Sequence, residues 1–227
     1  MTDAGHGPSA PDRRRILLLV GAAGAGKGTQ AELLSRELDL PHLASGDLFR
    51  QAIRDGTPLG ERARAYMERG DLVPDDVTIG MLMQQLAQPD AARGVILDGF
   101  PRTVAQARAL DATLAGQGER INRVVYIDVP TDELVARLAG RYVCSTCGAT
   151  YHELTNPPRV PGICDNDGTP LEQRDDDRPE VVRARLSKQV PPMLEVVDHY
   201  DRAGVVTRVD GRQPIEAVKR AILDELA

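Results

Sequence analysis

Residues 15–30 read RILLLVGAAGAGKGTQ, a short apolar run followed by a glycine-rich segment that contains Lys27. An unbroken apolar run of this length is typical of a parallel strand that is buried on both faces. Glycines in the following segment allow backbone N–H groups to turn inward around an anion, and the next helix adds its positive N-terminal end. The segment therefore predicts a phosphate-binding loop with Lys27 reaching the outer phosphates; the alternative is a glycine-rich turn with an unrelated lysine.

The residue after Lys27 departs from the general motif, in which a Ser or Thr hydroxyl binds Mg²⁺. Here Gly28 holds that place and the hydroxyl comes at Thr29. We therefore expect phosphate oxygens and water to hold Mg²⁺, with carboxylates acting through those waters. Asp98 follows the apolar run 95–97 and is one such carboxylate, although an Asp at the end of a strand can also cap a turn or a helix.

Apolar runs and amphipathic stretches alternate along the rest of the chain. The weaker apolar runs cover 41–44, 95–97, 124–127 and 205–209, and the amphipathic stretches cover 29–38, 48–54, 59–69, 75–86, 104–114 and 132–138. Alternation of strand and helix predicts an α/β fold with a parallel sheet and right-handed crossovers.

Two segments interrupt this alternation. Residues 141–177 contain all three cysteines and many turn residues; they are too long for a structureless loop, so we expect a small subdomain with its own staple. A helical pattern resumes from 180 to 200, where Pro191-Pro192 should kink or split it. Residues 1–14 are rich in Gly, Pro and polar residues and predict a disordered tail.

Composition excludes several classes of protein. A length of 227 residues suits one large domain, or one domain with an insertion. The net charge of −6 and the pI near 5.3 argue against a nucleic-acid binder. No apolar run is long enough to span a membrane, and no secretory signal is visible. Three cysteines, an odd number, favour a reducing cytoplasm over a disulfide framework.

The segment 141–177 carries two pairs of candidate metal ligands, Cys144 with Cys147 and Cys164 with Asp167. Each pair has a two-residue gap, and sixteen residues separate the pairs, a spacing that lets two turns close a tetrahedron around Zn²⁺. Four protein ligands leave no open position, so the site should be structural. Asp165 or His152 could replace Asp167 without keeping the spacing. The alternatives are a redox-active pair of Cys144 and Cys147, and three inert thiols.

Several motifs, taken in order, resemble those of adenylate kinases. They are Gly21–Gln30, Ser45-Gly46-Asp47-Leu48-Phe49-Arg50, Asp98-Gly99-Phe100-Pro101-Arg102-Thr103, Arg141, and Arg174-Asp175-Asp176-Asp177 with Arg183 and Arg185. The resemblance runs from about residue 15 to 227 and implies a P-loop kinase fold, with a five-stranded parallel sheet flanked by helices. The core would comprise 15–140 and 178–227, including an AMP-binding segment at 44–73. The insertion 141–177 resembles the long lid of bacterial members, some of which bind zinc through three Cys and one Asp.

The resemblance also implies a reaction, the reversible transfer of the γ-phosphoryl group of ATP to AMP to give two ADP, which serves adenine nucleotide homeostasis. Charge would be neutralised by Mg²⁺, by Lys27, and by four arginines whose planar forks suit phosphate oxygens: Arg102, Arg141, Arg174 and Arg185. No general base is needed because the AMP phosphate is already anionic, and none of the four histidines is interpreted as catalytic. Asp47 joins Asp98 as a candidate carboxylate near Mg²⁺.

Two nucleotide sites follow from the same resemblance. The AMP site would comprise Ser45, Arg50, Asp71, Leu72, Val73, Gly99, Phe100, Pro101, Arg102, Gln106, Arg174 and Arg185. The ATP site would comprise Gly24, Ala25, Gly26, Lys27, Gly28, Thr29, Arg141, Thr150, Tyr151 and Gln213. Gln106 lies one helical turn after Arg102, so one nucleotide could meet both, and its amide could read an adenine edge. The alternative for Gln106 is an exposed helical glutamine.

Other functions fit these residues less well. Within the same class, the alternatives are an AMP kinase that uses GTP and a kinase for another nucleoside monophosphate. From a different class, a zinc-ribbon module on a P-loop scaffold could act as a nucleotide-dependent switch, but a switch needs only one nucleotide. The expected partners are ATP and AMP or ADP, with neither nucleic acid nor membrane, and we expect a monomer.

Overall fold

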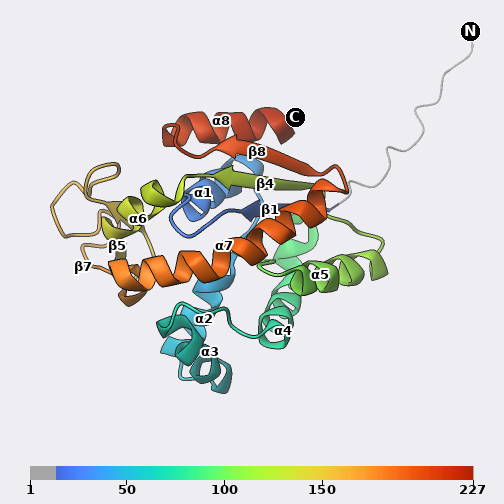
Figure 1. The fold of residues 1–227 in the computed structure, drawn as a ribbon, viewed down its shortest axis with the longest axis horizontal. Coiled ribbons are helices and arrows are strands. Elements are labelled where there is room, and N and C mark those ends of the chain that lie inside the picture. The colour runs from blue at the N-terminus through green and yellow to red at the C-terminus, as the bar shows by residue number, and fades with distance from the viewer. Residues whose placement is uncertain (1–13, 227) are drawn as a thin grey trace, which may run out of the picture.

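The computed structural model describes residues 14–226 as an α/β fold built around a five-stranded parallel sheet (Figure 1). In spatial order the strands are β2 (His42–Ala44), β3 (Gly94–Asp98), β1 (Arg15–Val20), β4 (Arg123–Asp128) and β8 (Val206–Asp210). The predicted parallel sheet flanked by helices is therefore confirmed, and each strand lies close to its predicted range.

Helices cover both faces of this sheet, which explains why its central strand is apolar from Ile16 to Val20. On one face lie α4 (Asp75–Leu86), α5 (Val104–Gly116) and the C-terminal half of α7 (Pro179–Asp201). On the other lie α1 (Lys27–Leu38), α6 (Thr131–Ala139) and α8 (Ile215–Leu226), and the N-terminal half of α7 packs into the same core. Ile16 and Leu18 pack into the first of these two cores, and Leu17 and Leu19 into the second. Alternate residues of β1 therefore bury their side chains in opposite layers.

Two further units project from the sheet. The first comprises α2 (Ser45–Arg54) and α3 (Pro58–Glu68), and it has a core of its own around Phe49 and Ala63. The second contains the three-stranded antiparallel sheet of β5 (Arg141–Cys144), β6 (Thr150–His152) and β7 (Leu171–Glu172). The short 3₁₀ turns η1 (Pro89–Ala92) and η2 (Asp175–Asp177) precede β3 and α7. Both projecting units border the carboxyl edge of the parallel sheet, where ligands of such folds bind.

The structure differs from the sequence prediction in α7. The helix continues without a break through Pro191 and Pro192, so the predicted split is wrong. Each proline removes one N–H from the hydrogen-bond ladder. Leu186 before the prolines and Val196 after them are buried, however, so packing on the sheet holds both halves in one helix.

Near both ends of the described residues, the structure also differs from the sequence prediction. The helix α8, which packs on α1 and β8, was not among the predicted stretches. The predicted tail, residues 1–14, lies outside the described residues except for Arg14. The Arg14 guanidinium donates to the carbonyls of Ala91 and Leu86 at 2.7 and 2.8 Å, so Arg14 does not belong to a disordered tail.

Candidate functional site

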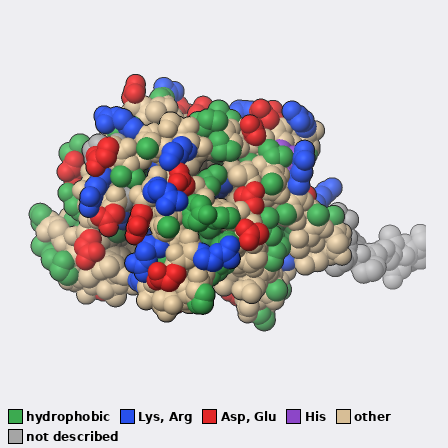
Figure 2. Space-filling model, turned by 60° about the horizontal axis from the view of Figure 1, so that its bottom comes forward, with side chains coloured by type: hydrophobic (Ala, Val, Ile, Leu, Met, Phe, Trp, Pro, Cys, Tyr) green, Lys and Arg blue, Asp and Glu red, His purple; other side chains and the backbone are tan. Residues whose placement is uncertain are grey.

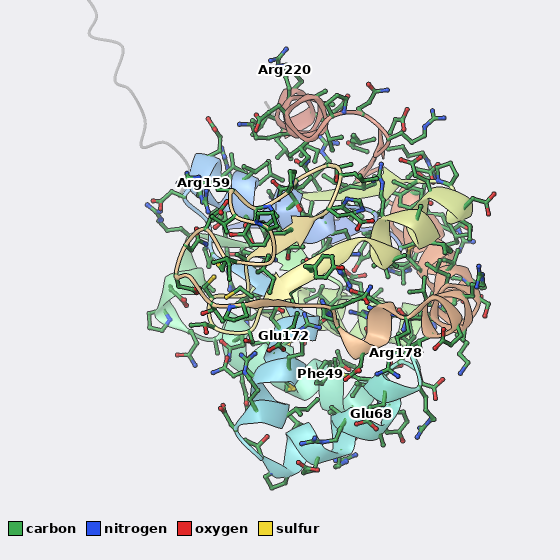
Figure 3. The ribbon with its side chains drawn as sticks, turned by 90° about the vertical axis from the view of Figure 1, so that its left-hand side faces the viewer. Phe49, Glu68, Arg159, Glu172, Arg178 and Arg220 are labelled. Carbon is green, nitrogen blue, oxygen red and sulfur yellow. The ribbon has the colours of Figure 1, made fainter. Side chains whose placement is uncertain are left out.

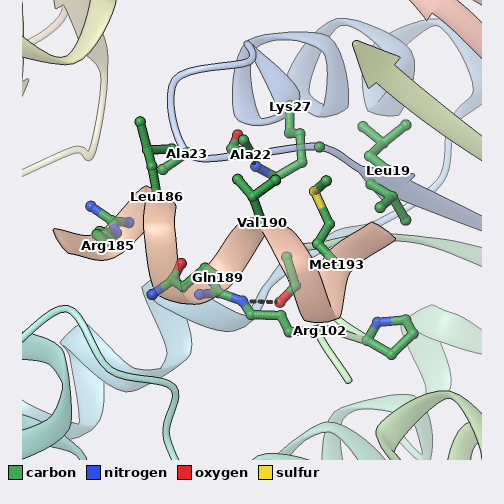
Figure 4. A pocket seen from close by; sticks show the side chains of 14 residues that line it. Leu19, Ala22, Ala23, Lys27, Arg102, Arg185, Leu186, Gln189, Val190 and Met193 are labelled. Carbon is green, nitrogen blue, oxygen red and sulfur yellow. Dashed lines mark hydrogen bonds between the residues drawn. The ribbon is translucent and has the colours of Figure 1, made fainter. Parts of the chain in front are cut away.

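The predicted phosphate loop connects β1 to α1 at the carboxyl end of the central strand. Gly24 and Gly26 have φ angles of +86° and +94°, in the left-handed region that favours glycine. A Cβ atom on Gly24 would lie 2.9 Å from Leu138, because the loop packs closely on α6. Lys27 folds back over the loop, and its Nζ donates to the Ala22 carbonyl at 3.0 Å (Figure 4). The lysine is thus held against the loop.

Lys27 and Asp98 bring opposite charges to this loop. Burial and, to a lesser degree, neighbouring arginines lower the pKa of Lys27 to about 8, against the opposing effect of Asp98. For Asp98, burial acts to raise the pKa, but His42, Lys27 and Arg102 together hold it below its usual range. The Nε2 atom of His42 lies 3.5 Å from Oδ2 of Asp98. An ionised carboxylate is therefore available beside the loop for a Mg²⁺ ion that phosphates would bring.

Two pockets meet beside the loop. The first has an empty volume of about 510 Å³ and is lined by the phosphate loop, Lys27 and the inner side of α7 (Figure 4). The second has an empty volume of about 500 Å³ and is lined by α2, the turn between α3 and α4, and Gln106. Arg102, Arg185 and Gln189 line both pockets. Anions in the two pockets would therefore face the same pair of guanidinium groups.

The floor of the second pocket is ordered by hydrogen bonds to one carbonyl. The Gly99 carbonyl accepts from the Ser45 hydroxyl at 2.7 Å and from Nε of Arg102 at 2.6 Å. Gly99 has a φ of +71°, and a Cβ there would come within 3.1 Å of the Ser45 hydroxyl, so glycine suits this position. Gln106 is buried, which contradicts the alternative of an exposed helical glutamine.

The turn between α3 and α4 brings Asp71 against α7. Hydrogen bonds from Lys188 and Arg69, at 2.6 and 3.0 Å, hold the pKa of Asp71 below its usual range. Nε2 of Gln189 donates to the Gly70 carbonyl at 2.8 Å. The Asp71 side chain is therefore paired with protein cations, and its backbone is the part left to line the pocket.

Asp47 lies on the side of the second pocket. It is on α2, its side chain is 69% exposed, and it pairs with Arg50, which lines the second pocket. Asp47 is not among the residues that line the first pocket, beside the phosphate loop. Of the two predicted carboxylates, Asp98 is the one that lies against Lys27.

Two of the predicted arginines, Arg141 and Arg185, meet at the junction of the lid and α7, where the backbone of Arg174 also lies. Nε and Nη2 of Arg141 grip the fully buried Asp177 carboxylate at 2.7 and 2.6 Å, and Arg185 approaches the same carboxylate at 3.8 Å. The Asp177 amide donates to the Arg174 carbonyl at 3.0 Å. One carboxylate thus organises the cations that are attributed to both nucleotides, and a fork that grips a carboxylate also suits a phosphate.

The remaining predicted ATP residues lie farther from these pockets. The Tyr151 side chain is buried in the small core of the lid, and its hydroxyl accepts from the Asp165 amide at 2.8 Å. Thr150 is exposed. Gln213 lies in the turn after β8, where its side chain and that of Arg212 donate to Asp210. A contribution of Tyr151 to nucleotide binding would therefore come from its backbone.

The predicted metal ligands form one cluster. Cys144, Cys147, Cys164 and Asp167 each offer a ligand atom, and these four atoms all lie within 4.8 Å of one another. Figure 3 looks onto the lid that contains them, with Arg159 and Glu172 labelled on it. The two alternative ligands are engaged elsewhere: Asp165 accepts from the Arg159 amide at 2.9 Å, and Nδ1 of His152 accepts from the amides of Leu154 and Thr155.

The donor set of this cluster suits Zn²⁺. Three thiols and one carboxylate match the soft and oxygen donors of structural zinc sites. The Thr169 amide donates to Asp167 at 3.0 Å, and this hydrogen bond is the main cause that holds the pKa of Asp167 below its usual range. All three thiols are free rather than paired in a disulfide. The residues present therefore fit a four-coordinate metal without an open position.

Several residues that build the site were missed by the sequence interpretation. They are His42, which lies against Asp98; Asp75, which accepts from Gln106; Asp177, which grips Arg141; and Lys188 with Gln189, which contact the turn between α3 and α4. Asp177 belongs to a motif that was recognised, so it could have been included. The other contacts join elements far apart in the chain, and nothing in their local sequence marks them.

A phosphate loop with a buried lysine, beside a second pocket that shares its arginines, defines the class of nucleoside monophosphate kinases. The match to known proteins narrows this class. A family model described as adenylate kinase matches residues 19–205, and the chain belongs to the adenylate kinase family.

Named relatives cover nearly the full chain. An adenylate kinase of Exiguobacterium sibiricum is 50% identical over 202 residues, covering 89% of this chain and 94% of that protein. An adenylate kinase of Moorella thermoacetica is 51% identical over 206 residues, covering 91% and 95%. An adenylate kinase of Staphylococcus aureus is 46% identical over 210 residues, covering 92% and 98%. Among the described residues, none of the helices combines the length and apolar character that crossing a membrane requires.

Proposed function

We propose that this protein catalyses the reversible, Mg²⁺-dependent transfer of the γ-phosphoryl group from ATP to AMP, giving two ADP, and thereby serves adenine nucleotide homeostasis. The observation that carries the proposal is the meeting of two pockets at Arg102 and Arg185. Phosphoryl transfer requires two polyphosphate anions in line with their repulsion cancelled. A nucleotide-dependent switch would require one such pocket.

In this proposal ATP phosphates bind the loop and the lid side. The backbone amides of the loop and the N-terminus of α1 supply hydrogen bonds and positive potential. The residues assigned to ATP are Gly24, Ala25, Gly26, Lys27, Gly28, Thr29, Arg141, Thr150, Tyr151 and Gln213. Support comes from Lys27, whose lowered pKa reflects a buried cation that gains stability when an anion arrives.

AMP binds the second pocket, with its phosphate toward Arg102. The residues assigned to it are Ser45, Arg50, Asp71, Leu72, Val73, Gly99, Phe100, Pro101, Arg102, Gln106, Arg174 and Arg185. Support comes from the hydrogen bonds that fix Arg102 on the Gly99 carbonyl and from the burial of Gln106. The AMP phosphate attacks as an anion, so the chain needs to position and neutralise it rather than to deprotonate it.

Adenylate kinases use Mg²⁺ with ATP, and the residues around the loop fit this ion. Asp98 is held ionised near Lys27, and a Cβ on Gly28 would lie 3.6 Å from its Oδ2, so this carboxylate lies beside the phosphate loop. We assign Asp98, with Asp47 as the weaker candidate, to waters of the ion. When bound, Mg²⁺ would supply positive charge that neutralises the charge developing on the transferred phosphoryl group.

We propose that two units close over the substrates: the lid, residues 141–177, stapled by a structural Zn²⁺, and the AMP-binding segment, residues 44–73. Residues 15–140 and 178–227 would form the core. Closure excludes water, which would otherwise hydrolyse ATP. We expect a cytoplasmic monomer that needs no partner beyond its nucleotides.

The proposal is tested by measuring ADP formation from ATP, AMP and Mg²⁺, across the alternative donor GTP and the acceptors CMP and UMP. Preference for CMP or UMP over AMP would overturn the assignment of the acceptor site. Saturation with only one nucleotide per chain would overturn the proposed reaction and favour the switch.

The variant Lys27→Met tests the role of the phosphate-loop lysine in the same reaction. Because its cation neutralises the transferred phosphoryl group, we expect kcat to fall by about 10³-fold or more. The melting temperature should not fall, because burial disfavours the Lys27 cation in the protein without nucleotide. A mild effect on kcat in a folded variant would contradict the role given to this lysine.

A further inference from the structure

The amide of Gln106 makes a hydrogen bond at each end. Its Oε1 accepts from the backbone N–H of Arg102 at 2.8 Å. Its Nε2 donates to Oδ1 of Asp75 at 2.7 Å. Gln106 is 1% exposed and yet lines the second pocket, so its buried amide borders the space that a ligand would occupy.

These two partners fix which end of the amide is oxygen and which is nitrogen. A backbone N–H can only donate, and an ionised carboxylate can only accept. An inverted amide would set its NH₂ group against the Arg102 N–H and its oxygen against the Asp75 carboxylate, leaving both contacts repulsive in a buried place. The cost of such unsatisfied buried groups is high, so one orientation is selected.

Asp75 is itself held in place. It is the first residue of α4, and its second oxygen accepts from the Thr103 hydroxyl at 3.0 Å. The Thr103 hydroxyl caps the N-terminus of α5 by accepting from the backbone N–H of Gln106 at 3.1 Å. Asp75 therefore connects the first turn of α4 to the first turn of α5. Because Asp75 is itself fixed in this way, it can hold the Gln106 side chain in one orientation.

The locked amide still has one donor and one acceptor to offer. Each of its polar atoms uses only part of its hydrogen-bonding capacity on the protein. A 6-aminopurine presents an acceptor at N1 beside a donor at the 6-amino group, which complements this amide. A 6-oxopurine of the same shape presents the reverse pattern. An amide free to invert could serve either base, whereas a locked amide serves one.

We propose that Asp75 is a positioning residue that determines the base specificity of the second pocket, by locking Gln106 in the orientation that accepts a 6-aminopurine monophosphate and rejects a 6-oxopurine monophosphate. This inference rests on the proposed function and deepens it. Asp75 acts through Gln106 and does not touch the phosphates, so its loss should change acceptor selection rather than the phosphoryl-transfer step.

The experiment compares AMP and IMP, two acceptors of the same shape and opposite pattern, in the wild type and in Asp75→Ala and Asp75→Asn. In Asp75→Ala we expect KM for AMP to rise about tenfold, with kcat nearly unchanged, and the preference for AMP over IMP to shrink by about tenfold or more. Asp75→Asn should recover part of the preference, because its side-chain oxygen still accepts from Nε2 of Gln106.

Asp76→Asn is the matched control. Asp76 is the next residue of α4, its side chain is 74% exposed, and its Arg62 partner lies 3.7 Å away. It should keep the wild-type ratio of AMP to IMP use. Melting curves of all variants separate a change in selection from loss of folding, and Asp75→Asn serves as the informative variant if Asp75→Ala fails to fold.

The outcomes separate the two levels of the proposal. If the wild type does not phosphorylate AMP, the proposed function fails. If the wild type prefers AMP and folded Asp75 variants keep the full preference and the wild-type KM, the inference about Asp75 is wrong and the proposed function stands. A preference that narrows in Asp75→Ala, returns in part in Asp75→Asn and is unchanged in Asp76→Asn supports the inference.

Discussion

The proposed lid and the proposed AMP-binding segment both project from the core, but they are stabilised differently. The lid, residues 141–177, contains three short strands and a core of few side chains, around Cys144, Tyr151 and Cys164. Its other large apolar side chains include Leu154, which is 80% exposed. The AMP-binding segment, residues 44–73, is mainly helical and buries Phe49, Ala63 and Val73 in a core of its own, together with Val77 of α4.

This difference shows how short insertions can reach an ordered state. A segment with a small apolar core needs a staple, and the four clustered residues Cys144, Cys147, Cys164 and Asp167 suit that purpose in the lid. The AMP-binding segment uses helix packing instead, and it reaches α7 through exposed polar contacts such as Asp71 with Lys188. Figure 2 shows acidic and basic side chains interspersed on the face that includes this segment. We expect the lid to depend on metal and the AMP-binding segment to depend on ionic strength.

The largest losses of activity should come from removing Arg102, on the side of the AMP-binding segment, or Arg141, on the side of the lid. Arg102→Ala removes the cation fixed on the floor of the AMP pocket, and Arg141→Ala removes the one that leads into the lid. Each should lower kcat/KM by about 10²- to 10³-fold, because these cations stabilise transferred charge.

The two variants should differ in binding. Arg102→Ala should weaken AMP binding more than ATP binding, and Arg141→Ala should do the reverse. Titration of each nucleotide against each variant by calorimetry measures this contrast. Equal weakening of both nucleotides in both variants would contradict the assignment of the arginines to separate sides.

Removal of the lid metal should have the next largest effect. Elemental analysis of protein purified without chelator should find one zinc per chain. Chelation, or Cys147→Ser, should lower the melting temperature by about 10 °C, because loss of a structural metal ranks among the strongly destabilising changes. Leu154→Ser, an exposed change in the same lid, is the control and should leave the melting temperature unaltered.

The same metal removal distinguishes the two units. AMP affinity should remain close to that of the wild type, because none of the metal ligands lines the second pocket. Native protein without bound metal would contradict the zinc assignment. Collapse of AMP binding after chelation would show that the lid and the AMP-binding segment are not independent.

A smaller effect is expected from Lys188→Ala, which removes the exposed contact between α7 and Asp71. KM for AMP should rise about two- to fivefold at low salt, and the difference from the wild type should shrink as salt is added. Lys219→Ala, which removes a lysine paired with Glu216 on α8, is the control. Steady-state kinetics at several salt concentrations measure both. A rise in KM that persists at high salt would argue against an electrostatic contact.

The smallest signal concerns the proton on Lys27. Its pKa of about 8 in the free protein should rise when ATP phosphates bind, because an adjacent anion favours the charged form. Binding should then take up about half a proton at pH 8 and very little at pH 6.5, where Lys27 is already charged. Calorimetry in buffers of different ionisation enthalpy measures the uptake. Equal uptake at both pH values would contradict this origin.

The features that could be predicted share one property: their signal lies within a few consecutive residues. The glycines before Lys27 predict the phosphate loop. Two pairs of residues, each with a two-residue gap, predict the metal site. The strands follow from apolar runs because both faces of the sheet are covered. Pro191-Pro192 is also a strong local signal, yet it misled, since burial of Leu186 and Val196 holds α7 together.

Local pattern therefore determined the class of fold, the anion site and the metal ligands, because backbone geometry and ligand spacing act over short distances along the chain. Folding alone decided that Asp75 would orient Gln106, that Asp177 would grip Arg141, and that Asp71 would meet α7. Those partners are 31, 36 and 117 residues apart. Hydrogen bonds of this kind depend on how separately formed elements and loops pack, and no periodicity or motif along the sequence encodes that packing.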